Sequence, residues 1–303
     1  MLITKLHDAE PDFDTRQVRL MIADQFPAWA GLPLEPVSSS GTDNVMLTLG
    51  DRLVVRLPRT AAAVPSISKE WKYPRLLGPQ LPAPVPIPLA QGTSGRGYPW
   101  PWTVSGWLEG ENPSPGHAYG TGLAIDLANF IRALHAADVG NEAAAGPLQS
   151  YRGGQLASRD APTRSAIAKC AGLLDVPLVA AVWDAARDVA EGDGARVWIH
   201  TDLQPGNLLI ANGRLAGVLD WGGLAIGDPA VDLIVAWNLL EGEGRTAFRE
   251  AVGVDRATWE RGRAWALSIG VIAYPYYVHT NPALARVSKY QIEQVVADIS
   301  RTA

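Results

Sequence analysis

The stretch of sequence that decides the fold reads His200-Thr201-Asp202-Leu203-Gln204-Pro205-Gly206-Asn207, and Asp220-Trp221-Gly222 follows a short distance later. The segment 195–199 predicts a short strand that leads into this stretch. Pro205 and Gly206 suit a turn, because proline fixes its own φ and glycine tolerates left-handed backbone geometry. The sequence therefore predicts a polar loop that begins where a strand ends.

A β-hairpin is predicted between the two polar stretches. The apolar run Leu208-Leu209-Ile210 predicts one strand, Asn212-Gly213 predicts a tight turn, and the segment 215–219 predicts the return strand. A hairpin of this kind is expected to bring Asp220 back beside Asn207, although the two residues are separated in sequence.

These residues suit phosphoryl transfer. The pattern H-x-D-L-x-x-x-N is that of a kinase catalytic loop, and D-x-G is that of the metal-binding aspartate that follows it. In this interpretation Asp202 orients and deprotonates the attacking hydroxyl, and Asn207 and Asp220 bind Mg²⁺. The alternative is that Asp, Asn and Gly gather in turns without chemistry, but the complete pattern with a hairpin between its halves favours the catalytic interpretation.

Further motifs extend the match, namely Leu134-His135-Ala136-Ala137, Leu219-Asp220-Trp221 and Gly227-Asp228-Pro229-x-x-Asp232-Leu233. With them the chain resembles the aminoglycoside phosphotransferase family, within the protein-kinase-like fold, from about Val37 to the last helix. The resemblance implies an α+β, bilobal architecture. Residues 1–105 would form a nucleotide-binding lobe with a small antiparallel sheet, and residues 106–303 a mostly helical catalytic and substrate-binding lobe.

The expected N-terminal lobe begins with an amphipathic helix near residues 15–26. Strands are predicted at 34–38, 45–49 and 53–57, with Gly50-Asp51 as the turn between the last two. The loop before the strand pair contains Ser40, Gly41 and Thr42, whose small size allows backbone N–H groups to approach phosphate oxygens. We expect this loop to cover the phosphates of the nucleotide, although it lacks the G-x-G-x-x-G of protein kinases and a plain polar loop is the alternative.

Arg56 stands where kinases carry the phosphate-binding lysine. A guanidinium keeps its charge and can bind phosphate oxygens in a bidentate manner, so the role can survive the exchange. Its expected partner is Glu70, on a helix predicted at about 63–77, by analogy with the Lys–Glu pair of kinases. Arg59 is a competing candidate, and a surface role for either arginine is the alternative.

A proline-rich connector at 81–88 is interpreted as an internal link, with a polyproline ligand as the alternative. A last strand of the small lobe is predicted at about 101–107. The hinge follows at 105–110, where the backbones of Gly106 and Leu108 are expected to meet the purine. The resemblance thus assigns nucleotide binding to residues far apart in the sequence.

The second lobe opens with a helix whose apolar positions recur between residues 123 and 134. Asp228 is predicted to be a helix N-cap with Pro229 in the first turn. In the resembled fold an aspartate at the position of Asp232 braces the catalytic loop through backbone amides, and His135 is interpreted as structural. Helices are predicted at 176–189, 256–274 and 283–299, whereas 151–166 gives no clear pattern beyond a bend at Gly153-Gly154.

Two departures from protein kinases disfavour a protein substrate. Gln204 stands where protein kinases often place a lysine, two residues after the catalytic aspartate, and Thr201 replaces the arginine that would bind an activation-loop phosphate. There is also no A-P-E segment. The sequence therefore points to a small-molecule acceptor.

Composition excludes several classes. The chain has 303 residues, 47% hydrophobic residues, a net charge of −5 and a pI near 5.6, which predicts a globular protein without a nucleic-acid-binding surface. Cys170 is the only cysteine, so no intrachain disulfide can form, and a reducing, cytoplasmic location is expected. The first residues do not resemble a signal peptide, no apolar run is long enough to predict membrane insertion, and the sequence leaves the oligomeric state open.

The predicted reaction moves the γ-phosphoryl group of ATP or GTP to a hydroxyl of a small molecule. An aminoglycoside-type or related antibiotic is the first expectation for the acceptor, because of the family name. The alternatives are a metabolic kinase for choline, a sugar or an amino alcohol, and a nucleotide-binding pseudoenzyme. Glu241 and Glu243 either bind ammonium groups of the acceptor or are solvated, and Tyr274, Tyr276 and Tyr277 either line a pocket or pack within the lobe.

Overall fold

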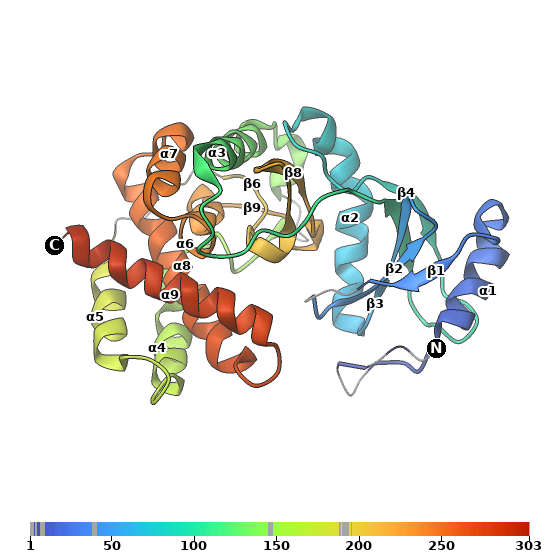
Figure 1. Cartoon of the computed structure of the whole chain (residues 1–303), viewed down its shortest axis with the longest axis horizontal. Coiled ribbons are helices and arrows are strands. Elements are labelled where there is room, and N and C mark those ends of the chain that lie inside the picture. The colour runs from blue at the N-terminus through green and yellow to red at the C-terminus, as the bar shows by residue number, and fades with distance from the viewer. Residues whose placement is uncertain are drawn as a thin grey trace. The chain divides into compact units, whose positions relative to one another are not determined.

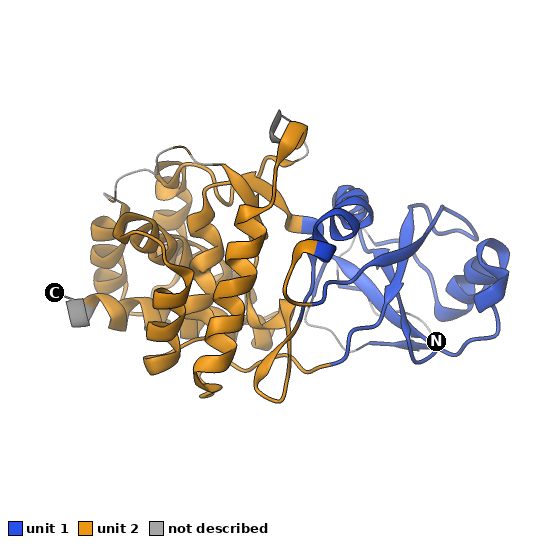
Figure 2. Ribbon diagram, turned by 90° about the horizontal axis from the view of Figure 1, so that it is seen from above, with its two compact units in different colours: residues 1–79, 84–109, 217–222 blue, residues 80–83, 110–216, 223–303 orange. Residues whose placement is uncertain are grey.

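The chain folds into two compact units, which Figure 2 shows in different colours. This computed structural model describes residues 3, 5, 6, 10–37, 41–144, 148–187, 189, 194 and 196–302. Unit 1 comprises residues 1–79, 84–109 and 217–222, and unit 2 comprises residues 80–83, 110–216 and 223–303. The α+β fold class predicted from the sequence is confirmed, whereas a lobe boundary between residues 105 and 106 stays a prediction.

Unit 1 is built on a five-stranded antiparallel sheet in the order β1-β2-β3-β5-β4. Its strands are β1 (Leu34–Pro36), β2 (Asn44–Leu49), β3 (Leu53–Pro58), β4 (Pro88–Gly92) and β5 (Trp102–Gly106). The β2–β3 hairpin turns at Gly50, whose φ of 61° is accessible to glycine without strain. The three strands predicted before residue 58 are present, and so is the strand predicted at 101–107.

The edge strand β4 was not predicted. It begins at Pro88, the last residue of the proline-rich connector, and its pairing with β5 is irregular between Pro88 and Ala90. Proline is tolerated at the first residue of an edge strand because the missing N–H is not needed there. The strand is thus formed by pairing with β5 and not by a period-2 pattern of its own.

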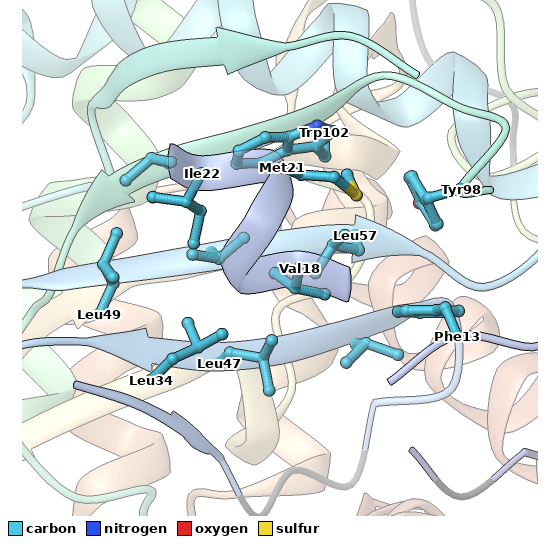
Figure 3. Close-up of a cluster of buried hydrophobic side chains, with 13 residues drawn as sticks. Phe13, Val18, Met21, Ile22, Leu34, Leu47, Leu49, Leu57, Tyr98 and Trp102 are labelled. Carbon is cyan, nitrogen blue, oxygen red and sulfur yellow. The ribbon is translucent and has the colours of Figure 1, made fainter. Parts of the chain in front are cut away.

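The helix α1 (Thr15–Gln25) covers one face of this sheet, and α2 (Val64–Leu77) covers the other (Figure 1). Asp14 caps α1 in a capping box with Gln17, whose N–H lies 2.8 Å from the Asp14 carboxylate. Figure 3 shows the resulting core, in which Val18, Met21 and Ile22 of α1 face apolar side chains of the sheet. Because side chains alternate along a strand, the opposite face of β3 presents Arg56 toward α2.

Unit 2 is mostly helical. Its α-helices are α3 (Gly120–Ala136), α4 (Asp160–Lys169), α5 (Val176–Arg187), α6 (Val235–Asn238), α7 (Gly242–Val252), α8 (Arg256–Tyr277) and α9 (Pro282–Thr302). The helix α8 is buried along much of its length and contacts α4, α5 and α9. Among the described residues, none of the helices combines the length and the apolar character that a membrane span requires.

Short strands support the polar loop of unit 2. The strand β6 (Val197–Ile199) pairs antiparallel with β9 (Ala225–Gly227). The strands β7 (Leu208–Ala211) and β8 (Arg214–Val218) form the predicted hairpin, with φ of 51° at Asn212 and 71° at Gly213. These angles suit Asn-Gly, which confirms the predicted turn. The expected placement of Asp220 beside Asn207 stays a prediction.

The close packing of β4 against Trp102 leads to a stability prediction. A side chain at Gly92 would overlap the indole of Trp102, which also contacts Phe26 edge-on at 5.4 Å between ring centroids. We expect Gly92→Ala to lower the free energy of unfolding by about 1–3 kcal/mol, because overpacking forces the core to shift. Denaturant titration measures this change. Gly95→Ala is the control, since its nearest neighbour would lie 3.5 Å away, and an equal loss in both variants would contradict the prediction.

Candidate active site

The polar loop after β6 has a strained backbone. Thr201 has a φ of 72°, which is rare for any residue other than glycine and especially unfavourable for a β-branched one. Its hydroxyl donates to the carbonyl of Gly223 at 3.0 Å, and both His200 and Thr201 are buried. Such strain persists only where surrounding contacts impose it, and it is common at functional sites.

Asp232 imposes this geometry. Its fully buried carboxylate accepts the N–H of His200 at 3.0 Å and the N–H of Thr201 at 2.8 Å. The same carboxylate lies 3.0 Å from Nε2 of His135. These contacts confirm the predicted bracing role of Asp232 and the structural role of His135. Asp228 is the predicted N-cap and accepts from Ala230 N–H at 3.0 Å, although the turn that it opens is a 3₁₀ helix, Pro229–Ile234.

The carboxylate of Asp202 follows directly and is held on both oxygens. Oδ2 accepts from Nδ2 of Asn207 at 2.9 Å, and the same amide donates to the Asp202 carbonyl at 2.9 Å. Oδ1 forms an ion pair with Arg152. The side chain nevertheless remains 30% exposed. Asp202 is thus fixed in orientation and open to a reactant, as a base for an incoming hydroxyl needs to be.

The side-chain amide of Asn207 uses only its nitrogen in its contacts with Asp202. Because its Nδ2 makes both contacts with Asp202, its Oδ1 points elsewhere and makes no hydrogen bond within the described part of the chain. Magnesium prefers such hard oxygen ligands. The amide of Asn112 supports this end of the loop by donating to the carbonyls of Leu208 at 2.8 Å and Gly206 at 3.2 Å.

A second charged cluster lies in unit 1. Nη2 of Arg56 lies 2.8 Å from Glu70 Oε1 and 2.7 Å from Asp220 Oδ1. Asn44 accepts from Nη2 and Nε of the same guanidinium at 3.1 and 3.3 Å when its amide oxygen faces it. The Arg56–Glu70 pair predicted from the sequence is therefore present. Arg59, the competing candidate, contacts Glu10 instead, at 2.8 Å.

The electrostatics of this cluster depend on the burial of Glu70. Burial raises the pKa of Glu70 to about 7, and the carboxylates of Asp220 and Asp43 act in the same direction, while Arg56 opposes them. Asp220 has a φ of 60° and a side chain that is 42% exposed. The carboxylate of Asp220 is therefore partly accessible, although it contacts Arg56.

The remaining predicted nucleotide-binding residues lie in unit 1. Ser40 falls outside the described residues, while Gly41 is exposed and Thr42 is half-buried at the start of β2. The N–H of Gly106 donates to Ile87 at 3.4 Å and that of Trp107 to Arg52 at 2.7 Å. In the described part of the chain, Leu108 N–H has no hydrogen-bond acceptor. Of the two predicted hinge residues, Leu108 thus offers the available donor.

Two residues that contact the loop were missed by the sequence analysis. Arg152 lies in the segment that gave no clear pattern, and Asn112 lies just after the predicted hinge. A single arginine or asparagine in a polar stretch carries no periodic signal. Arg152 and its partner Asp202 are 50 residues apart in the sequence, and Asn112 and Leu208 are 96 residues apart. Only the folded chain reveals either contact.

The sheet of unit 1, the braced Asp202 loop of unit 2 and the Arg56–Glu70 pair define a phosphotransferase with a kinase-like fold. The sequence profile described as "Phosphotransferase enzyme family" matches residues 34–265, so the chain belongs to that family of small-molecule phosphotransferases. No curated protein sequence matches the chain.

Solved structures show the same fold. The GDP complex of wild-type aminoglycoside 2'-phosphotransferase-IIIa has a TM-score of 0.74 at 18% identity, over 95% of this chain and 100% of that chain. The streptomycin-ATP-APH(2")-IIa ternary complex has a TM-score of 0.62 at 16% identity, over 93% and 98%. Macrolide 2'-phosphotransferase type I has a TM-score of 0.63 at 20% identity, over 96% and 99%. At these identities the likeness shows the fold and not the substrate.

Removal of the Asp232 charge tests the bracing of the loop. In Asp232→Asn an amide N–H₂ replaces one acceptor oxygen, so a buried N–H of His200 or Thr201 loses its partner. We expect the free energy of unfolding to fall by about 3 kcal/mol, because hydrogen bonds to a buried charge are lost and a donor stays unsatisfied. Denaturant titration measures the loss. Asp24→Asn, at a surface ion pair with Arg96, should leave the midpoint unchanged, and a stable Asp232→Asn protein would contradict the prediction.

The raised pKa of Glu70 predicts a pH dependence of stability. A carboxyl with a pKa of about 7 in the folded protein and 4.5 when unfolded keeps its proton in the folded state between these values. The contribution of the Glu70 carboxyl to the free energy of unfolding is therefore complete below about pH 4.5. It declines as the pH rises toward and through 7. Relative to Glu70→Gln, which mimics the protonated form, the wild-type protein should lose stability between about pH 5 and pH 8. Denaturant titrations of both proteins across that range measure the two free energies of unfolding. A constant difference between these free energies would contradict the prediction.

Proposed function

We propose that this phosphotransferase moves the γ-phosphoryl group of ATP or GTP to a hydroxyl of an aminoglycoside-type or related antibiotic. The observation that carries the proposal is the state of Asp202. Its carboxylate is oriented by Asn207 and Arg152, follows a strained loop braced by Asp232, and remains open to a reactant. A pseudoenzyme has no need to maintain such an arrangement.

The proposal assigns a role to each of the predicted site residues. Asp202 accepts the proton of the attacking hydroxyl, whose oxygen then forms a bond to the γ-phosphorus. Arg56, held by Glu70, steadies the phosphates of the donor, and the loop with Ser40, Gly41 and Thr42 covers them. Gly106 and Leu108 contribute the backbone that meets the base. Positioning and charge stabilisation of this kind supply most of the catalysis in phosphoryl transfer.

The donor set suits Mg²⁺. Asn207 offers a free amide oxygen and Asp220 a half-exposed carboxylate, and both are hard oxygen ligands. We infer that these two residues hold the magnesium ion that accompanies the nucleotide. When bound, Mg²⁺ neutralises charge on the phosphate oxygens and so assists the transfer.

The acceptor is proposed from two observations. Structures of the same fold are named for aminoglycoside and macrolide phosphotransferases. In this chain, exposed carboxylates of Glu241 and Glu243 stand at the start of α7, where Tyr290 OH lies 3.3 Å from Glu241. Exposed carboxylates can pair with the ammonium groups of an aminoglycoside in charge-assisted hydrogen bonds.

A panel of acceptors tests the proposal. The purified protein with Mg²⁺ and either ATP or GTP is incubated with kanamycin, gentamicin, streptomycin, erythromycin and choline, and phosphorylated products are detected by mass spectrometry. We expect an aminoglycoside product, and we expect Asp202→Asn to lower kcat about 100-fold or more because the base is lost. Asp184→Asn, at a surface pair with Arg164, is the control. Phosphorylation of choline alone would instead assign a metabolic kinase, and no product with any acceptor would refute the proposal.

A further inference from the structure

Arg152 is the one cation that contacts the carboxylate of Asp202 among the described residues. It lies in the connection between α3 and α4, far from the catalytic loop in sequence. Its Nη1 donates to Asp202 Oδ1 and also to the carbonyl of Thr201 at 3.1 Å, and its Nε donates to the hydroxyl of Tyr151 at 3.1 Å. The guanidinium thus binds both the side chain and the strained backbone of the catalytic loop.

The backbone that carries Arg152 is fixed by close packing. Gly153 has a φ of 79°, and a side chain there would overlap Ile199 of β6. The carbonyl of Gly153 accepts from Asp228 N–H at 2.8 Å, and a side chain at Gly227 would come within 2.6 Å of that carbonyl. The turn therefore fits directly against β6 and β9, so Arg152 is placed by the same framework that positions Asp202. A preorganised cation of this kind loses little entropy when a reactant binds.

One edge of the guanidinium remains available. Nη1 and Nε are engaged, whereas Nη2 makes no hydrogen bond to any residue in the described part of the chain. The Arg152 side chain is 24% exposed and that of Asp202 is 30% exposed. A hydroxyl bound at Asp202 would place the phosphoryl group that it attacks within a few ångströms of this free edge.

The chain also lacks the usual source of positive charge at this place. Protein kinases often have a lysine two residues after the catalytic aspartate, and here that residue is Gln204. The transferring phosphoryl group carries negative charge on its three equatorial oxygens, and a cation that meets this charge accelerates the reaction strongly. Arg152 supplies a cation beside Asp202 that Gln204 does not.

We propose that Arg152 is a further catalytic residue of this phosphotransferase. Its Nη1 orients Asp202, and its Nη2 donates to an oxygen of the phosphoryl group that is being transferred. In the step, the acceptor oxygen forms a bond to the γ-phosphorus and its proton passes to Asp202. The bond from the γ-phosphorus to the bridging oxygen breaks, and its electron pair leaves with the nucleoside diphosphate. This inference rests on the proposed function, since it assigns a role within the same reaction.

The test uses Arg152→Gln, Arg152→Lys and the matched control Arg159→Gln. Arg159 is suitable because its guanidinium lies 4.7 Å from the centre of the same Tyr151 ring but is not paired with Asp202. Steady-state hydrolysis of Mg-ATP and Mg-GTP, with water as the acceptor, is the assay, so no antibiotic needs to be identified first. We expect Arg152→Gln to lower kcat about 100-fold with a much smaller change in nucleotide KM, and Arg152→Lys to retain more activity.

Thermal unfolding separates catalysis from folding. The expected result is that Arg152→Gln keeps a cooperative transition while kcat falls, and that Arg159→Gln resembles wild type. A kcat for Arg152→Gln within threefold of wild type, a loss confined to KM, or an equal loss in Arg159→Gln would each overturn the inference. Asp202→Asn is measured in parallel. If it loses activity while Arg152→Gln does not, only the role of Arg152 fails, whereas absence of turnover in the wild type, with water and with the antibiotic panel, refutes the proposed function as well.

Discussion

The buried carboxylate of Asp232 is the constraint on which the catalytic loop depends. It accepts the N–H groups of His200 and Thr201, and these two hydrogen bonds help to offset the strain of the left-handed backbone at Thr201. His135, from α3, contacts the same carboxylate, so the loop is tied to a helix as well as to the turn that carries Asp232. Asp202 comes directly after the strained position, and the amide of Asn207 donates to both the carbonyl and the carboxylate of Asp202.

Each unit contains an arginine that is paired with a carboxylate of the candidate site. In unit 1, Arg56 contacts both Glu70 and Asp220, and in unit 2, Arg152 contacts Asp202. Arginine suits both places, since its planar group binds two partners at once and keeps its charge when partly buried. Arg56 and Gln204 both stand where kinases often carry a lysine, and in this chain Arg56 contacts Asp220 and Arg152 contacts Asp202.

Residues 112–119 contact both the polar loop after β6 and the last helix. Asn112 binds the loop backbone at Leu208, and Tyr119 OH accepts from Ser114 N–H at 2.7 Å. Gly116 has a φ of 74°, and a side chain there would lie 3.2 Å from the ring of Tyr290 on α9. Residues of this segment are therefore fixed by contacts on both sides.

The sequence by itself determined the fold class, most strands and helices, the hairpin after Asn207 and the Arg56–Glu70 pair. The strands, helices and turn rest on local signals, since strand alternation, helical periodicity and turn residues act over a few positions. The Arg56–Glu70 pair was predicted from the resemblance to the Lys–Glu pair of kinases. Only the tertiary structure revealed the pairing of β4 with β5, and it alone showed the helix α7, whose Phe248 and Val252 are buried. It alone revealed Arg152 beside Asp202, 50 residues apart, because a contact made by chain folding leaves no period in the sequence.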